Sequence, residues 1–79
     1  MAQIDIKNIK RTEKERNNVH DKVHGTYSVF EREGKKYFQL DTFGRSNREL
    51  PGKLSQTIQL DKEAAQFLVD LLRENFDLD

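Results

Sequence analysis

Apolar and polar residues alternate along several stretches of this chain, and the last stretch instead repeats with the period of a helix. A period of two is typical of a half-buried strand, because successive side chains point to opposite faces of a sheet. The alternating stretches are 4–7, 26–31, 36–43 and 55–60. After Asp61 the apolar residues recur every three or four positions, as on one face of a helix; they are Ala64, Ala65, Leu68, Leu71, Leu72 and Phe76. The pattern predicts an α+β fold in the order β-β-β-β-α.

Turn and cap residues separate these elements. Residues 32–35 contain Gly34, which adopts a positive φ without strain, and they predict a hairpin between the second and third strands. Pro51 and Gly52 are a strong turn signal before the fourth strand. Asp61 is a good N-cap for the helix. We therefore expect a small, curved antiparallel sheet of about four strands and one C-terminal amphipathic helix.

The alternation also assigns side chains to the two faces of the sheet. In the third strand we expect the even positions, Phe38, Leu40 and Thr42, to be buried. The odd positions, Tyr37, Gln39, Asp41 and Phe43, should lie on the other face. In the fourth strand we expect Ile58 and Leu60 in the core, with Ser55, Thr57 and Gln59 exposed.

With 79 residues the chain makes a single domain, 1–79, near the lower size at which a core stabilises a fold alone. Within it, residues 10–25 are almost entirely polar and are expected to form a mobile loop. Phe67 and Val69 widen the apolar surface of the helix beyond what one sheet face needs. We expect a homodimer to cover this surface, with the alternative that the N-terminal segment wraps the helix.

Charge is distributed unevenly along a chain whose formal net charge is zero. Residues 1–55 carry twelve Lys and Arg against eight Asp and Glu, whereas residues 56–79 carry two against six. Either this is ordinary scatter, or a basic sheet surface meets a polyanion while the acidic helix faces elsewhere. The chain has no cysteine and no apolar run long enough for a signal peptide or a membrane span. We expect a cytoplasmic protein, nucleoid-associated if bacterial, with no membrane partner.

The sequence contains little that points to catalysis or metal binding. His20 and His24 have helical spacing, but they lie in the polar loop with no obvious third ligand. No nucleophile elbow, phosphate loop or dinucleotide fingerprint is present. We expect no enzyme activity, no catalytic residue, no metal site and no cofactor.

Basic turns next to exposed aromatic residues form the remaining candidate site. Tyr37 and Phe43 share the strand face opposite the expected core, and basic residues flank the connections: Lys35, Lys36, Arg45, Arg48 and Lys53. Single-stranded nucleic acid requires this combination, because cations contact phosphates while aromatic rings stack on unpaired bases. Alternatively, the rings pack against the loop or a partner and the basic residues only confer solubility.

The stretches 34–41, 51–53 and 57–61 together resemble the positive-cofactor-four transcriptional coactivators. The similarity covers about residues 27–75, and its most specific part is the Pro-Gly-Lys turn leading into Ile58-Gln59-Leu60 and the helix. The resemblance implies a β-β-β-β-α domain that dimerises and binds single-stranded DNA. It also implies phosphate contacts from Lys35, Lys36, Arg45, Arg48 and Lys53, and base stacking on Tyr37 and Phe43. The chain departs from the family in its long loop and in lacking a Gly directly before the Ile-x-Leu strand.

Two functions follow from the sequence. The first is binding of single-stranded DNA or RNA with little sequence specificity, in transcription or DNA metabolism. The second is a non-enzymatic protein-interaction adaptor or regulator, which the neutral net charge favours because most nucleic-acid modules are clearly basic.

Overall fold

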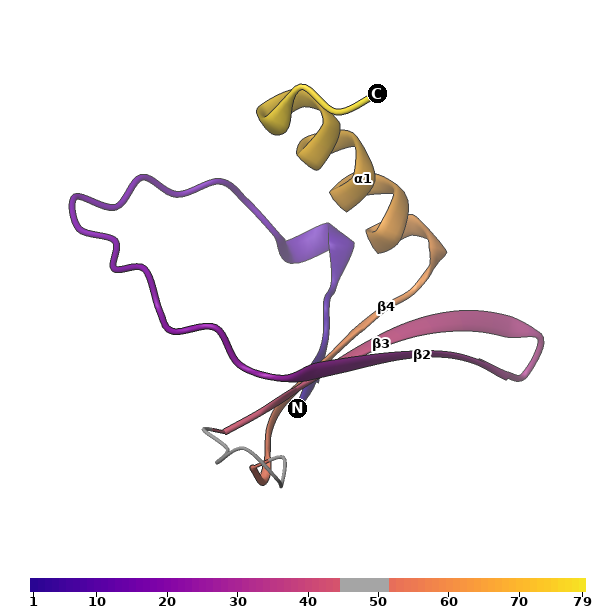
Figure 1. Ribbon diagram of the computed structural model, residues 1–79. Coiled ribbons are helices and arrows are strands. Elements are labelled where there is room, and N and C mark those ends of the chain that lie inside the picture. Colours follow the sequence, from indigo (N-terminus) through magenta and orange to yellow (C-terminus); the bar gives the residue numbers. More distant parts are fainter. Residues whose placement is uncertain (45–51) are drawn as a thin grey trace.

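A computed structural model describes residues 1–44 and 52–79 of the protein. The elements are β1 (Ala2–Gln3), a 3-10 turn η1 (Ile6–Asn8), β2 (Gly25–Arg32), β3 (Lys35–Phe43), β4 (Leu54–Leu60) and α1 (Lys62–Phe76). The strands form one sheet in the order β1-β4-β3-β2, and the helix follows β4 directly (Figure 1). This confirms the predicted α+β fold and its element order.

The β2–β3 hairpin has the tight turn that the sequence predicted. Glu33 and Gly34 are its two central residues, and both have positive φ values, 53° and 79°. Two successive positive φ values match the right-handed twist of the flanking strands. Pairing then runs without interruption from Arg32 opposite Lys35 to Gly25 opposite Thr42.

The first strand differs from its prediction. We expected a strand at 4–7, but there the Asp5 side chain accepts a hydrogen bond from the backbone N of Lys7 at 3.0 Å and starts the η1 turn. Asp competes well with extended structure by bonding to a nearby backbone N–H. The strand instead comprises Ala2–Gln3 and pairs with β4 in parallel, whereas an all-antiparallel sheet was predicted. No short turn joins β1 to β4, so no hairpin fixes their relative direction.

The register of β2, β3 and β4 defines two faces of the sheet. The apolar face carries Tyr27, Val29, Phe38, Leu40, Ile58 and Leu60, and the polar face carries Ser28, Phe30, Tyr37, Gln39, Asp41, Phe43, Thr57 and Gln59. The prediction assigned the β3 and β4 residues to the correct faces, but it was wrong about the burial of Leu40, Ile58 and Thr57. Leu40 is 44% exposed and Ile58 39%, while Thr57, expected on the surface, is 7% exposed.

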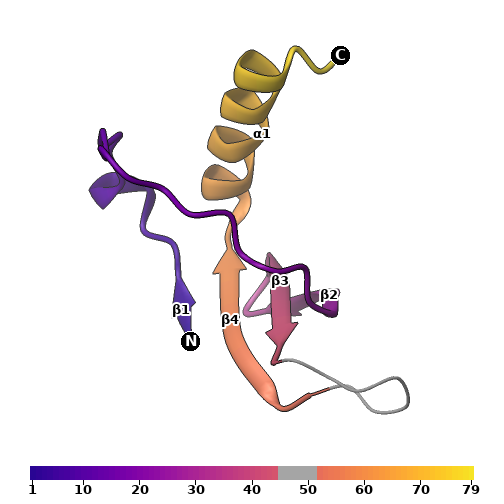
Figure 2. The same cartoon turned by 60° about the vertical axis from the view of Figure 1, so that its left-hand side comes forward.

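The reason is that nothing in the described chain covers the middle of the apolar face. Figures 1 and 2 both show α1 rising away from the sheet instead of lying across it. Among the described residues, the buried side chains are those of Ala64 and Thr57. The fold therefore leaves its apolar face largely open.

The helix begins as predicted. Oδ1 of Asp61 accepts a hydrogen bond from the backbone N of Ala64 at 2.8 Å, and Glu63 lies in the first turn. Its apolar side chains remain exposed by 37–40%: Phe67, Leu68, Val69, Leu71 and Leu72. At 1.5 Å per residue, α1 extends about 22 Å, most of it away from the sheet.

Residues 9–24 connect η1 to β2 without a helix or strand. They form the wide excursion at the side of the molecule in Figure 1. In the part of the chain that the structure describes, no helix has the length and apolar character needed to cross a membrane.

Candidate nucleic-acid interface

The polar face presents a row of alternate β3 side chains, Lys35, Tyr37, Gln39, Asp41 and Phe43. Every second residue of a strand faces the same way, at intervals of about 6.8 Å. The row thus has an aromatic ring on either side of an amide and a carboxylate, with a lysine at the hairpin end.

Hydrogen bonds join the centre of this row to β4. Thr57 Oγ1 donates to Asp41 Oδ1 at 2.5 Å, directly across the β3–β4 pair. Gln39 Nε2 donates to both oxygens of Asp41, at 3.2 and 3.1 Å. Gln59 Nε2 donates to Gln39 Oε1 at 2.8 Å. These four side chains form one connected group, called here the amide–carboxylate network.

The network explains why Thr57 is buried. Its hydroxyl is held against a carboxylate, and bonds of this kind are short and stronger than bonds between neutral groups. Its neighbour on the other side is the parallel strand β1, which the sequence did not place beside β4. Thr57 therefore lies between two strands, and its alternation pattern gave no sign of that.

The two predicted stacking residues lie on the same face, as expected, but in different surroundings. Tyr37 already stacks on Phe30 of β2, with ring centroids 5.4 Å apart and planes at 21°. Phe43 lies at the other end of the row, opposite Leu54, where the β3–β4 register shifts. Both rings are half-buried. The contact with Phe30 therefore already occupies one face of the Tyr37 ring.

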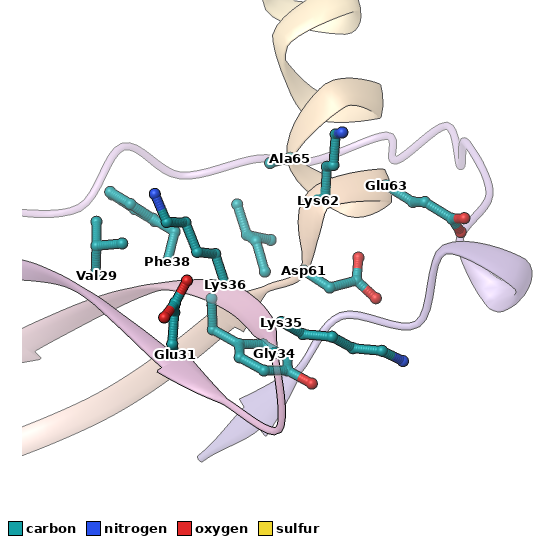
Figure 3. Close-up of a pocket in the computed structure, with 12 residues that line it drawn as sticks. Val29, Glu31, Gly34, Lys35, Lys36, Phe38, Asp61, Lys62, Glu63 and Ala65 are labelled. Carbon is teal, nitrogen blue, oxygen red and sulfur yellow. The ribbon is translucent and has the colours of Figure 1, made fainter.

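The structure separates the two neighbouring lysines of the hairpin. Lys35 belongs to the polar face with Tyr37, whereas Lys36 lies opposite Glu31 on the apolar face. Figure 3 shows Lys36 on the same side as Val29 and Phe38. By register Lys36, predicted as part of the site, therefore does not belong to the polar face, although it lines one hollow together with Lys35 and Tyr37.

The remaining predicted basic residues follow β3. Lys53 lies directly before β4, and its backbone oxygen accepts a hydrogen bond from Gly44 N at 2.8 Å, so it is close to the Phe43 end of the row. Arg45 and Arg48 lie outside the described residues. Among the described predictions, Lys35, Tyr37, Phe43 and Lys53 thus share the polar face or its margin.

Two hollows border the sheet. The first has a volume of about 800 Å³ and lies between the hairpin and the start of α1 (Figure 3). Its apolar lining comes from Val29, Phe38, Leu60 and Ala65, and its charged lining from Glu31, Lys35, Lys36, Asp61, Lys62 and Glu63. Tyr37 also lines it, so at the hairpin end this hollow reaches residues of both faces. Mixed charge around an apolar floor is typical of a protein contact and not of a polyanion site.

The second hollow, about 370 Å³, lies on the polar face. It is lined by the amide–carboxylate network together with Met1, Ala2, Gln3 and Leu54. Sequence reasoning placed Gln39, Asp41 and Gln59 on this face but assigned them no role. For Gln39 and Asp41 the available signal was their position between Tyr37 and Phe43 on one strand face. The contribution of β1 had no signal in the sequence.

Side chains that could together hold a metal ion do not cluster in the part of the chain that the structure describes. No group of three or more His, Cys, Asp or Glu side chains comes together there.

No protein-family model, curated protein or solved structure matches the chain.

Proposed function

We propose that the protein is a non-catalytic, homodimeric module that binds single-stranded DNA or RNA through its polar face. The observation that carries the proposal is the β3 row, which puts Tyr37 and Phe43 on one face with Lys35 at the hairpin end. Extended single strands are bound by such combinations of stacking surfaces and nearby cations. The resemblance to the positive-cofactor-four coactivators supports the same function, in transcription or DNA metabolism.

The polar face also meets the steric requirement for an extended strand. It spans β2, β3 and β4, and α1 rises from the opposite side, where the hollow of Figure 3 lies. Lys35 and Lys53 lie towards opposite ends of the β3 row. Phosphates therefore have cations at both ends, with aromatic and amide groups between them.

The homodimer is supported by the open apolar face and the exposed helix. Val29 is 60% exposed, and the apolar α1 side chains add a second uncovered surface. Most of the stability of a helix in a protein comes from packing of its apolar face, and the described residues of one copy leave that face of α1 exposed. A second copy of the chain has the same apolar surface, so self-association is the simplest way to cover the apolar face and α1.

Fluorescence anisotropy with labelled single-stranded oligonucleotides tests the binding. Affinity should fall steeply between about 50 and 200 mM salt. Lys and Arg side chains that contact phosphates release the counterions condensed there, and added salt opposes this release. The matched variants are Lys35→Ala and Lys36→Ala, which remove the same charge from opposite faces. Lys35→Ala should weaken binding and reduce the salt slope by about 0.7, while Lys36→Ala should change both much less. Equal effects of the two variants would contradict the polar face as the interface.

Light scattering at micromolar concentration tests the dimer. A monomer that binds no oligonucleotide at low salt would overturn the proposal. In that case the apolar face would become a docking surface for another protein, as the adaptor alternative requires.

A further inference from the structure

We propose that His24 is a further nucleic-acid-binding residue of the polar face, and that its protonation makes the affinity for single strands rise as the pH falls. This rests on the proposed function, to which it adds one contact residue and a dependence on pH. It is carried by the continuation of the sheet past the end of β2, which places His24 beside Phe43.

The ladder between β2 and β3 continues one residue beyond the start of β2. Gly25 lies opposite Thr42, and the backbone N of Phe43 then donates a hydrogen bond to the backbone oxygen of His24 at 3.0 Å. His24 therefore occupies the position opposite Phe43. Since Ser28 belongs to the polar face and successive side chains alternate, His24 falls on the polar face as well.

Three neighbouring segments of the chain meet at this end of the β3 row. Directly opposed residues of a ladder have Cβ atoms about 4.5–5.5 Å apart, so the side chain of His24 starts beside that of Phe43. On the other side of Phe43, the hydrogen bond from Gly44 N to the backbone oxygen of Lys53 brings Lys53 to the same end. A base that stacks on Phe43 would thus have Lys53 on one side and His24 on the other for its phosphates.

The side chain of His24 is open to a ligand. It is exposed, and within the residues that the structure describes it forms no ion pair. Because β2 is an edge strand of the sheet, no other described strand packs on its outer side. The charged groups around His24 are Asp41, diagonally opposite on β3, Lys53 beyond Phe43, and Asp21 and Lys22 in its own segment. Asp41 already accepts hydrogen bonds within the amide–carboxylate network.

Protonation decides what His24 contributes to binding. Histidine side chains gain their positive charge between roughly pH 8 and pH 5, a range in which Lys and Arg keep theirs. Phe43 is therefore flanked by Lys53 alone when His24 is neutral, and by two cations when His24 is charged. Each cation that meets a phosphate of a single strand adds about 0.7 to the salt slope. Since the charged form binds phosphate better, affinity rises as the pH falls.

Anisotropy titrations of a labelled thymine oligonucleotide at about pH 5.5 and about pH 7.5 test this dependence. The unaltered protein should bind about fivefold more tightly at the lower pH, the effect of one added charge pair at about 4 Å in water. His24→Gln should lose this difference, whereas His20→Gln, which alters the other histidine of the chain, is the matched control and should keep it. His24→Arg has a permanent charge, so at the higher pH it should match the unaltered protein at the lower pH. The α-amino group of Met1 and all carboxylates are the same in every variant.

The outcomes separate this proposal from the proposed function. If the unaltered protein and His24→Gln bind single strands with the same response to pH, His24 is not a contact and the proposed function stands. Loss of the response in His20→Gln would move the effect to the loop and would likewise overturn the role of His24. If no variant binds single strands at either pH, both proposals fall.

Nuclear magnetic resonance provides a readout that does not depend on a variant. At the lower pH, addition of the oligonucleotide should shift the ring signals of His24 and shift those of His20 far less. Equal shifts at both residues, or none, would overturn the proposal. If His24→Gln fails to fold, these signals and the affinity of His24→Arg decide.

Discussion

Removal of the helix cap should destabilise this protein more than a typical cap substitution does. Oδ1 of Asp61 accepts the backbone N–H of Ala64, and Ala64 is only 2% exposed. Loss of an N-cap costs about 1 kcal/mol when water can replace the lost acceptor. Here water has little access, so Asp61→Ala leaves a buried donor without a partner, a cost of roughly 1–3 kcal/mol. We expect the free energy of unfolding to fall by about 2 kcal/mol.

Asp61→Asn is the matched control, because Asn caps helices as well as Asp does. It removes only the interaction of the negative charge with the helix dipole, which contributes about 0.3–1 kcal/mol. Since Glu63 remains in the first turn, we expect the lower end of that range. The structure therefore predicts a clear order: the unaltered protein, then Asp61→Asn close to it, then Asp61→Ala well below.

Urea unfolding followed by circular dichroism measures these differences, and thermal unfolding provides a second readout. For a domain of this size, each kcal/mol corresponds to about 4–8 °C in Tm. All variants must be compared at one protein concentration, because self-association raises Tm with concentration. If Asp61→Ala matches the unaltered protein within a few tenths of a kcal/mol, the cap does not hold the start of α1. Equal losses in both variants would show that the charge, and not the hydrogen bond, is the stabilising element.

Three further substitutions test other features of the fold. Glu33→Asn should stabilise the hairpin by a few tenths of a kcal/mol in urea unfolding, because Asn-Gly suits the two positive φ values at Glu33 and Gly34 better than Glu-Gly; a loss of stability would contradict the turn assignment. Leu40→Lys, on the open apolar face, should convert the proposed dimer into a monomer by sedimentation velocity, whereas Ser28→Lys on the polar face should not. Thr57→Val keeps the shape of the side chain but removes its hydrogen bond to the carboxylate, so unfolding free energy should fall by about 1.5 kcal/mol; an unchanged value would mean that packing alone buries this residue.

The sequence predicted those parts of the fold that depend on neighbouring residues. Gly34 indicated the hairpin turn, Asp61 the start of the helix, and alternation assigned the β3 side chains to their faces. Each of these is a local property, in which a residue type favours one backbone conformation or one direction. Local preference also explains the error at 4–7, where Asp5 favours a turn that the apolar alternation concealed.

Burial could not be predicted in the same way, because it depends on what lies above a face. Leu40 and Ile58 have the residue types of a core, yet nothing in the described chain covers them. Thr57 has the residue type of a surface, yet β1 and Asp41 enclose it. The hollow on the polar face shares this limitation, since residues from the far end of the sequence, Met1, Ala2 and Gln3, line it.

The parallel pairing of β1 with β4 has a consequence for the timing of folding and opening. Ala2 pairs with Ile58 and Gln3 with Gln59, contacts that span almost the whole chain, whereas the β2–β3 hairpin closes over a few residues. Distant contacts cost more loop-closure entropy, so β1 should dock after the hairpin and β4 have formed. With so short a ladder, β1 should also detach without global unfolding, and the amide of Ile4, bonded to Gln59 O at 3.0 Å, should exchange its hydrogen faster than the amides of β3. One wall of the hollow would then open and close many times while the rest of the sheet stays folded.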